Sequence, residues 1–580
     1  MYIAKIHIEN FRCIKSADID VPKKAVVVGD NNSGKSTLIE AIDLVLGPDR
    51  TSRHPVINEH DFFAGKYNVE NEPCEIFIEV IVVDLNEEQK RYFLNHIEWF
   101  DTKENKLVDS IPAFSTSEEM ILPALRVCFK GFYNSEEDDF EGNTYFCNPI
   151  IGDNAQLDRF SKKDKRMCGF LYLRTLRTGS RALSLEHGSL LDIILSIKEL
   201  RPQMWEDVIG QLKQVTVAAE PEIGITEVLN SLQEEIHKYL PTDTANNPVL
   251  KISDMTRESL RKIIAVFLES EITLDDGTHF SIPYYKMGTG TINVLVLSLL
   301  SIIADLKQNV IFAMEEPEIA IPPYIQKSIV TNVLNNSQQA IFTSHSPYVL
   351  EEFSPDNVVV LSNKNGILSS KPAKLPPTVK MKTYRDDLRR KYFESLLSKR
   401  VLITEGRTEY DVYSAAARHL EELDPDKYSS FDRMGLALVN AETDTQVAPL
   451  GEYYKNLNKS VYAVFDKQEE EMSEKIGEIV DKAYEAQEHG IERVVINGVD
   501  EAALRRYALY LVSEDMWPER LSATVPTKDM SYEDLQKGMF KYFKGKKGDG
   551  SLADLIVFCN EAEMPAFIKE TIADLKAVLG

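Results

Sequence analysis

The chain has 580 residues, and 66 lysines and arginines against 92 aspartates and glutamates give it a formal net charge of −26. Its 43% hydrophobic and 27% charged residues are typical of globular proteins, which excludes a fibrous or largely disordered chain, and its length accommodates about three to five domains. The acidic balance argues against a protein that coats nucleic acid non-specifically, and the lack of a signal peptide or of a run of about 18 apolar residues predicts a cytoplasmic protein with no membrane partner.

The first part of the chain predicts a sheet with a loop and a helix. After an N-terminal strand, residues 25–28 form a short apolar run, and the apolar spacing of residues 36–46 predicts a helix that ends at Gly47 and Pro48. Further strands are expected over 73–83 and 121–133, followed by an acidic surface loop over 135–142.

The middle of the chain changes character. Apolar spacing over residues 188–240 predicts helices, with a break at Pro221. Strand signals return near 271–283, and an apolar helix over 292–306 and a strand over 310–314 follow. We therefore expect a helical insertion between two sheet-forming regions.

The last third predicts a separate α/β domain. Residues 371–400 hold ten lysines and arginines and three acids, which predicts a basic linker that could contact a DNA or RNA backbone, with a helix over 384–397. Beyond this linker, strand candidates alternate with helix candidates, as in a small parallel sheet. The strand candidates are residues 400–404, 436–440, 461–465 and 493–496.

The strongest motif is a phosphate-binding loop. Residues 29–37 (GDNNSGKST) fit G-x-x-x-x-G-K-[ST] between a predicted strand and a predicted helix. The glycines let backbone N–H groups wrap phosphates, and the helix N-terminus adds partial positive charge. Lys35 is expected to neutralise the β- and γ-phosphates of ATP, and the Ser36 hydroxyl to bind Mg²⁺. The expected ATP-binding residues of this loop are Asn32, Gly34, Lys35, Ser36 and Thr37.

A second pattern associated with nucleotide hydrolysis follows the predicted strand 310–314. Glu315 and Glu316 come at its C-terminal end, where α/β sheets place ligands. Glu315 is expected to act on Mg²⁺ directly or through water, and Glu316 to orient or deprotonate the attacking water. His345 follows another predicted strand and is expected to reach the γ-phosphate, although a lone histidine is more often structural.

Two further acids, Glu405 and Asp466, each follow an apolar predicted strand in the C-terminal region. Gly406 permits a tight turn close to a ligand. Parallel strands that deliver both carboxylates to one edge could hold Mg²⁺ or Mn²⁺, which prefer oxygen ligands. From the residues alone, acids at strand ends are as often surface groups as ligands.

The N-terminal part resembles the RecF/SMC branch of the ABC ATPases. The resemblance rests on the two nucleotide motifs, on residues 6–12 (IHIENFR) and on residues 344–347 (SHSP), with residues 61–63 (DFF) similar to the segment after the first helix of that branch. It implies that ATP is hydrolysed across a dimer interface.

Residues 287–293 (MGTGTIN) resemble a divergent signature loop of these ATPases. Gly288 and Gly290 would then complete the ATP site of a second copy, and a plain turn is the alternative. Arg177 and Arg181 follow a predicted strand and could meet phosphate or couple ATP to a DNA site; solvated arginines are equally compatible.

The strand that ends in Glu405, the strand that ends in Asp466 and their position after an ATPase resemble a Toprim domain. Over nearly the whole chain, the combination resembles the OLD (overcoming lysogenisation defect) family, which includes the nuclease subunit of the Gabija system and retron-associated OLD effectors. This resemblance implies metal-dependent DNA cleavage in anti-phage defence. It assigns Glu405 as general base or metal ligand, Asp466 as metal ligand and Glu409 as an auxiliary carboxylate.

The chain departs from the Toprim pattern at one position. These nucleases usually carry Asp-x-Asp at the second strand, whereas this chain has Gln468 after Asp466. A one-metal site, a weakened nuclease and an inactive domain all stay open. The nearby acids 469–471 are expected to be a solvated helix start, and Glu501 resembles the family's third acidic position as a metal ligand.

A basic, glycine-containing stretch near the C-terminus resembles a lysine element of OLD Toprim domains. Lys547, or equally Lys546, would stabilise transition-state charge. Tyr542 and Phe543 interleave with these lysines, a pattern suited to stacking on nucleic acid bases, while a solvated lysine run is the alternative.

The expected fold class is α/β, an ABC-type P-loop ATPase with a helical dimerisation insert and a C-terminal Toprim Rossmann-like domain. The expected function is an ATP-regulated, metal-dependent DNA endonuclease of the OLD type; the alternatives are a DNA-binding ATPase clamp or sensor with a degenerate Toprim domain, and a RecF-like repair ATPase. Expected partners are DNA, further copies in a homo-dimer or tetramer, and a helicase or a reverse transcriptase with its DNA–RNA hybrid. The expected segments are 1–183 and 248–370 (the two ATPase halves), 184–247 (the insert), 371–397 (the linker) and 398–580 (the Toprim domain).

Overall fold

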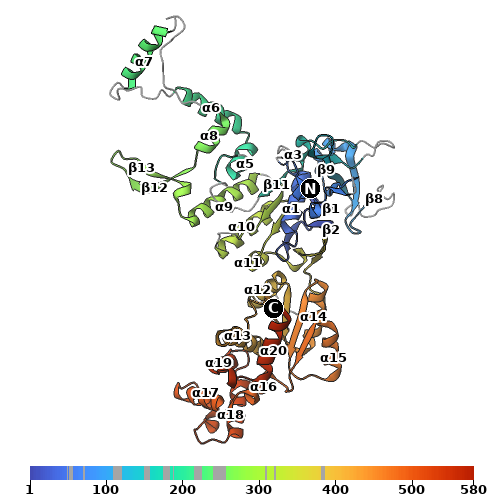
Figure 1. The fold of residues 1–580 in the computed structure, drawn as a ribbon, viewed down its shortest axis with the longest axis vertical. Coiled ribbons are helices and arrows are strands. Elements are labelled where there is room, and N and C mark those ends of the chain that lie inside the picture. The colour runs from blue at the N-terminus through green and yellow to red at the C-terminus, as the bar shows by residue number, and fades with distance from the viewer. Residues whose placement is uncertain are drawn as a thin grey trace. The chain divides into compact units, whose positions relative to one another are not determined.

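The structure is a computed structural model that forms two compact units, residues 1–167 with 341–580 and residues 168–340 (Figure 1). The described residues are 1–48, 50, 56–69, 72–108, 121–148, 157–173, 183–186, 189–214, 225–239, 256–306, 310–318, 322–379 and 386–579.

The N-terminal part of the first unit is built on a large mixed sheet. Strand β1 (Tyr2–Phe11) alternates buried and exposed side chains and pairs antiparallel with β2 (Ile14–Asp20) and β6 (Ile76–Val83), as expected for a sheet with one covered face. The strand order is β15-β3-β16-β17-β2-β1-β6-β9-β7-β8, with β10 paired to β9. The other strands are β3 (Lys24–Val28), β7 (Ile97–Asp101), β8 (Lys106–Val108), β9 (Ile121–Asn134), β10 (Asp139–Phe146), β15 (Gln339–Thr343), β16 (Val358–Lys364) and β17 (Ile367–Pro372), with the short pair β4 (Asn68–Val69) and β5 (Glu72–Pro73) beside them.

Helix α1 (Lys35–Leu46) is almost wholly buried and follows β3 through the phosphate-binding loop. Its C-terminal end is held by Lys165, a fully buried lysine whose Nζ donates to the Leu44 carbonyl over 2.8 Å. Positive charge at this end also complements the helix dipole. The remaining helices of this part are α2 (Glu87–Tyr92), α3 (Lys162–Cys168) and α11 (Pro347–Leu350).

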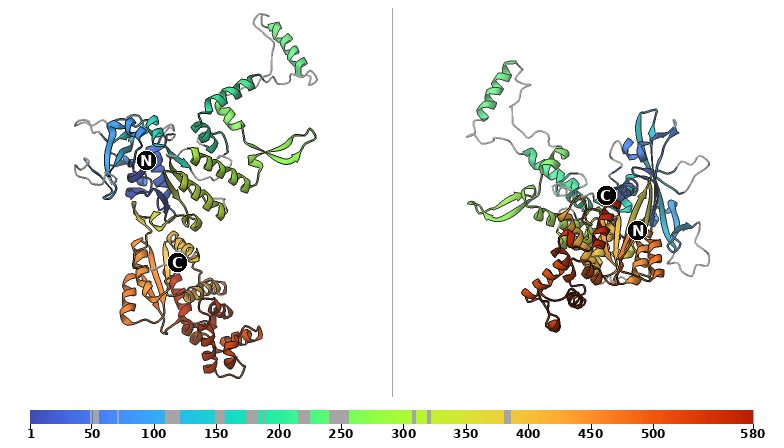
Figure 2. Two further views of the ribbon diagram at one scale, coloured as in Figure 1. Left: turned by 180° about the vertical axis from the view of Figure 1, so that it is seen from behind. Right: turned by 60° about the horizontal axis from the view of Figure 1, so that its bottom comes forward.

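The second unit is mainly helical. Strands β11 (Phe170–Leu173) and β14 (Ile311–Glu315) pair in parallel, and β12 (Phe267–Thr273) and β13 (His279–Pro283) form a separate hairpin that is visible in both views of Figure 2. The buried Asp192 carboxylate joins its own helix to two others, because it accepts from Arg261 over 2.9 Å and pairs with Arg201. The helices are α5 (Leu190–Ile197), α6 (Arg201–Gln214), α7 (Ile225–Tyr239), α8 (Arg257–Ile263), α9 (Thr289–Leu306) and α10 (Pro323–Asn336).

The C-terminal part of the first unit contains a four-stranded, fully parallel sheet with the order β19-β18-β20-β21. Helices lie on both of its faces (Figures 1 and 2), as an all-parallel sheet requires. The strands are β18 (Arg400–Thr404), β19 (Leu436–Asn440), β20 (Ser460–Phe465) and β21 (Lys482–Glu485). The helices are α12 (Asp386–Leu397), α13 (Arg407–Leu423), α14 (Val447–Asn456), α15 (Glu470–Ile479), α16 (Ile491–Gly498), α17 (Glu501–Ser513), α18 (Tyr532–Lys544), α19 (Ser551–Phe558) and α20 (Ala566–Leu579).

Three local predictions need correction. Residues 493–496, predicted as a strand, lie in helix α16, and the fourth strand of the sheet is β21, which was not predicted. The acidic loop is shorter than expected, because residues 139–142 already belong to β10. Strand β2 was also missed. Among the helices within the described ranges, none combines the length and apolar character needed to cross a membrane.

Candidate nucleotide and Toprim sites

The phosphate-binding loop has the backbone that its sequence predicts. Gly34 has a φ of 98°, which favours glycine, and helix α1 begins at the next residue. A Cβ on Gly29 would lie 2.7 Å from the Leu361 carbonyl oxygen, so that position also admits only glycine. The Lys35 amine donates to the carbonyl oxygens of Gly29 and Asp30 over 2.9 and 2.8 Å. These are contacts that phosphate oxygens can replace.

The other predicted residues of this loop divide into two groups. Asn32 and Ser36 are exposed, and Asn32 has a left-handed φ of 65°. Thr37 is buried, and its hydroxyl lies 3.3 Å from the Cys13 thiol, which gives this residue a packing role in the structure.

His345 follows β15, a neighbour of β3 in the sheet order. The Ser344 amide donates to the Val27 carbonyl oxygen over 3.4 Å, which fixes the start of the His345 turn against the strand that leads into the phosphate-binding loop. The His345 side chain is half-buried. The geometry thus brings the histidine turn and the phosphate-binding loop to one region of the first unit.

Two sequence segments of the ATPase resemblance also meet. The Arg12 guanidinium donates to the Asp61 carboxylate over 2.8 Å and pairs with Glu40 of α1 over 2.5 Å. Asp61 is buried, and Phe11 bridges Phe62 across the sheet edge. The ion pairs tie the first two strands to the first helix.

In the second unit, Glu315 is buried at the end of β14, and Glu316 follows with a φ of 46°. A left-handed backbone costs energy for a residue other than glycine and often occurs at functional positions. Gly288 and Gly290 are exposed, and a Cβ on either would meet no atom within 4 Å, so packing within the described residues does not require glycine there. Arg177 and Arg181 lie outside the described residues.

The Toprim acids Glu405 and Asp466 stand at the same end of adjacent parallel strands, because Thr404 of β18 pairs with Val464 of β20. The Asp466 amide donates to Glu405 Oε2 over 3.4 Å, and the Gly490 amide donates to Asp466 Oδ2 over 2.5 Å. Both acids are half-buried. The predicted pair is therefore brought together at one sheet edge.

Gln468 lies between these two acids. Its amide nitrogen Nε2 donates to Glu405 Oε2 over 3.1 Å and to Asp466 Oδ1 over 2.7 Å. The backbone of the same residue donates to Glu485 Oε1 over 2.9 Å. Acids 469–471 lie exposed at the start of α15, as predicted.

Glu409 is buried one turn into α13, where its carboxylate folds back towards the start of the helix. A Cβ on Gly406 would lie 2.7 Å from Glu409 Oε2, so the absence of a side chain at Gly406 leaves room for this carboxylate. Glu492, which the sequence analysis missed, is also buried, and its charge acts on Glu409. Lys547 Nζ lies 3.4 Å from Glu492 Oε1, which connects the predicted lysine to the acids.

The crowding of carboxylates changes their ionisation. Burial, together with the hydrogen bond and charge of Asp466, raises the pKa of Glu405 to about 8. Burial, together with the charges of Glu492 and Asp466, raises the pKa of Glu409 to about 7. Such shifts are common where carboxylates act on a ligand.

The carboxylates of Glu405 and Asp466 meet part of what a hard divalent cation such as Mg²⁺ requires of its ligands. One oxygen of Glu405 and one of Asp466 lie within about 3 Å of a single atom, and Mg²⁺ is often bound through one or two carboxylates with water. Within the described ranges, no group of three or more His, Cys, Asp or Glu side chains is arranged to hold a metal ion. The position of the second Asp-x-Asp acid is taken by the amide donors of Gln468.

Other predicted residues do not join this cluster in the way expected. Glu501 is exposed and pairs with Arg505 on its own helix over 2.6 Å. Tyr542 and Phe543 are buried in the core, so the predicted stacking on bases is wrong. Lys546 instead lies 4.9 Å from the centre of the Tyr542 ring.

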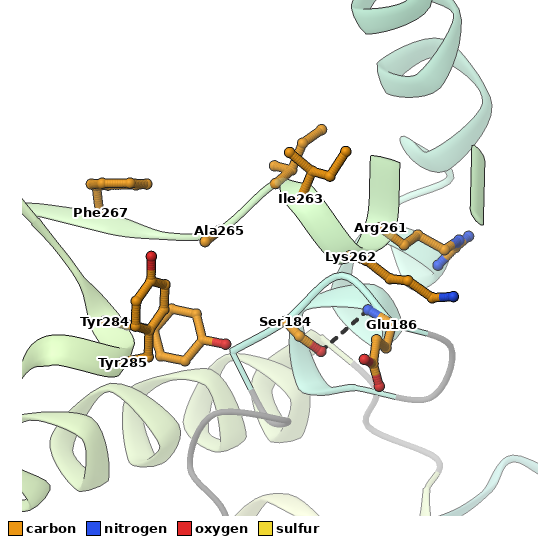
Figure 3. Close-up of a pocket in the computed structure, with 10 residues that line it drawn as sticks. Ser184, Glu186, Arg261, Lys262, Ile263, Ala265, Phe267, Tyr284 and Tyr285 are labelled. Carbon is orange, nitrogen blue, oxygen red and sulfur yellow. Dashed lines mark hydrogen bonds between the residues drawn. The ribbon is translucent and has the colours of Figure 1, made fainter. Parts of the chain in front are cut away.

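A pocket of about 550 Å³ in the second unit lies outside both predicted centres (Figure 3). Its walls combine Phe267, Tyr284 and Tyr285 with Arg261. This arginine is already engaged, because it donates to the Leu185 carbonyl over 2.7 Å and to Asp192. We assign no ligand to this pocket.

Comparison with known proteins agrees with the motifs. Residues 1–350 match the family of the AAA ATPase domain, and residues 396–467 match the TOPRIM domain of proteins like overcoming lysogenization defect protein. Endonuclease GajA of Bacillus cereus is 22% identical over 73% of this chain and 69% of that protein, and Old nuclease of Escherichia phage P2 is 22% identical over 73% and 71%. The SMC head domain from Thermotoga maritima aligns with 64% of this chain and 100% of that chain, with a TM-score of 0.30 and 13% identity. The predicted resemblance is confirmed, and these domains use a nucleotide and a divalent metal.

Proposed function

Because the chain belongs to the AAA ATPase domain family and carries an OLD-like TOPRIM domain, we propose that it is an ATP-regulated, metal-dependent DNA endonuclease of the OLD type. The names of its relatives, Endonuclease GajA and Old nuclease, support nuclease activity. The proposal extends to a role in anti-phage defence, to a homo-dimer or tetramer as the working form, and to the domain limits predicted from the sequence.

In the ATPase, Lys35 exchanges its loop carbonyls for the β- and γ-phosphates, and Ser36 and Glu315 hold Mg²⁺. Glu316 orients the attacking water, and His345 contacts the γ-phosphate. Gly288 and Gly290 close over the nucleotide of a second copy; among the described residues, no atom lies within 4 Å of a Cβ placed on either glycine. Each of these assignments rests on the motifs and their local geometry.

In the Toprim domain, Glu405 and Asp466 hold Mg²⁺ or Mn²⁺, and Glu409 supports them. A bound divalent cation supplies positive charge to the phosphate and lowers the pKa of water. Glu405, at the end of β18 beside Asp466, is the general base that accepts a proton from the attacking water. Lys547 is exposed and its amine can reach a phosphate oxygen, while Glu492 keeps it near the acids.

The observation that carries this proposal is the convergence of Glu405 and Asp466 at adjacent strand ends. The test is nicking of supercoiled plasmid with Mg²⁺ or Mn²⁺ by wild type, Glu405→Ala and the control Glu470→Ala, an exposed acid at the start of α15. We expect Glu405→Ala to cut about 10- to 100-fold more slowly and the control to match wild type. Equal cleavage by Glu405→Ala and wild type would contradict the assignment.

One observation favours a second function. The amide of Gln468 lies where the Toprim pattern usually has an acid, which favours a DNA-binding ATPase clamp whose Toprim domain binds without cutting. Wild-type protein that hydrolyses ATP and binds DNA, yet leaves duplex, hairpin and single-stranded DNA uncut with either metal, would support the clamp over the nuclease.

A further inference from the structure

We infer that the Gln468 amide bridges Glu405 and Asp466 at the position where the Asp-x-Asp pattern has an acid, so that the two acids are held together without metal and the site takes one cation fewer than an Asp-x-Asp site would. The inference rests on the proposed function for the role of the two carboxylates. Its own evidence is the geometry of the amide.

A primary amide has two N–H donors, and both find an acceptor here. Nε2 lies 3.1 Å from Glu405 Oε2 and 2.7 Å from Asp466 Oδ1, so a single nitrogen bridges the two carboxylates. Two carboxylates at this separation repel one another unless a donor or a cation offsets their charge. The amide thus does for the two acids, with partial charges, what a metal ion does with a full charge.

The position of Gln468 is fixed from outside the pair. Its backbone N–H donates to Glu485 Oε1 over 2.9 Å, and Glu485 ends strand β21 and also accepts from Ser473 over 2.5 Å. This anchoring holds the start of the side chain at the sheet edge. The bridge is therefore made by a residue whose backbone is anchored to the neighbouring strand β21.

Backbone donors complete the arrangement. Asp466 Oδ2 accepts from the Gly490 amide, and Glu405 Oε2 accepts from the Asp466 amide. Each acid thus receives one side-chain and one backbone donor. An aspartate at position 468 would remove the two amide donors and add a third carboxylate, and like charges at this range repel one another until a cation neutralises them.

The three acids that follow Gln468 in the chain do not replace the missing carboxylate. Residues 469, 470 and 471 are exposed at the start of α15. Glu409 lies beside Gly406 and its charge acts on Glu405, while Glu492 lies 3.4 Å from the Lys547 amine. The amide is therefore the chemical difference that sets the number of cations.

The test compares nucleotide-free wild type, Gln468→Asp and the control Gln487→Asp, which adds the same charge at an exposed position after β21. Bound Mn²⁺ per chain is counted from the electron paramagnetic resonance signal of free Mn²⁺. The number of Mn²⁺ ions bound by Glu405→Ala is subtracted from the number bound by each protein, so that sites elsewhere in the chain do not contribute. Melting temperatures are measured in EDTA.

We expect Gln468→Asp to gain one Mn²⁺ per chain and to melt about 2–4 °C lower in EDTA, with neither change in Gln487→Asp. An unchanged Mn²⁺ count in Gln468→Asp, an unchanged melting temperature, or an equal gain in Gln487→Asp would each overturn the inference. None of these readouts depends on cleavage, so a failed nicking assay counts against the proposed function alone.

Discussion

Gly406 is the smallest residue of the Toprim cluster, and its missing side chain leaves space that the Glu409 carboxylate occupies. In Gly406→Ala, the new Cβ would lie 2.7 Å from Glu409 Oε2 and push this carboxylate away. The displaced atom is the end of a flexible side chain, so we expect stability to change by about 1 kcal/mol or less. We expect DNA nicking to fall by about 10-fold, because a supporting carboxylate is misplaced.

Nicking rates and melting temperatures of Gly406→Ala, wild type and Gly477→Ala check this expectation. Gly477 is exposed on α15, and an added Cβ there would meet no atom within 4 Å, so its alanine variant should behave as wild type in nicking. Undiminished nicking by Gly406→Ala would show that the position of Glu409 is unimportant.

Lys459 makes the stability of the protein depend on pH. Burial lowers the pKa of its amine to about 8, although Nζ donates to the Leu396 carbonyl over 2.9 Å and to the Ser398 carbonyl. The unfolded chain keeps its proton up to a pKa of about 10.4. Between these values the unfolded state binds more protons, so the free energy of unfolding rises with pH.

We therefore compare the urea midpoints of wild type and Lys459→Met at pH 7.5 and 9.5. The stability of wild type relative to Lys459→Met should increase by about 1–2 kcal/mol over this interval. A relative stability that is constant or that falls with pH would mean that the buried amine is not the group responsible.

At the scale of elements, the C-terminal end of α1 is fixed by a group that the sequence pattern does not reveal. Lys165 is distant from α1 in the sequence. Its amine donates to the Leu44 carbonyl at the end of α1, so we expect it to stabilise the folded protein. Lys165→Met keeps most of the apolar stem and leaves a buried carbonyl without this donor, which should lower the free energy of unfolding by about 1–3 kcal/mol. Chemical denaturation measures the change.

The control for this expectation is Lys163→Met on the same helix. Lys163 is exposed, so its loss should cost about 0.5 kcal/mol or less. If both variants lose the same stability, the effect arises from helix α3 in general and not from the bond to α1.

The elements that sequence predicts best are those with a long apolar run beside a turn signal. Strands β18 and β20 and helix α1 have such runs, and their positions were predicted. Residues 493–496 failed because a short run of valine and isoleucine suits a buried helix as well as a strand. Strand β21 was missed because its four residues are half polar, so no alternation stands out.

The same error hid Glu492. This acid precedes the misassigned run, so the sequence placed the third acidic position at Glu501 instead. In the sequence, Gly490 could have indicated this position, because glycine often marks a turn. The structure has such a turn there, with a φ of 90° at Gly490. The bridge made by Gln468 depends on side-chain directions from two strands and could not be read from spacing.

At the scale of the whole molecule, the residues expected to act on ATP are divided between sequence segments that fold into different units. Lys35 and His345 belong to the first unit, whereas Glu315 and the glycines of the signature-like loop belong to the second. The match to the AAA ATPase domain family, over residues 1–350, covers residues of both units. A single substitution can therefore remove a residue of one unit and leave the ATP-site residues of the other unit intact.

Mixing two inactive variants tests whether ATP is hydrolysed between copies. Lys35→Ala lacks the phosphate contact, and Gly288→Asp alters the signature-like loop at an exposed position where an added Cβ would lie more than 4 Å from any atom of the described residues. If two copies share each ATP site, a mixed dimer contains one intact site. Equal mixing should then restore about one quarter of the wild-type ATPase rate, because about half of the dimers are mixed and each has one of two sites. A rate no greater than the sum of the separate variants would mean that each chain completes its own site, and the glycines would then have no role in a second copy.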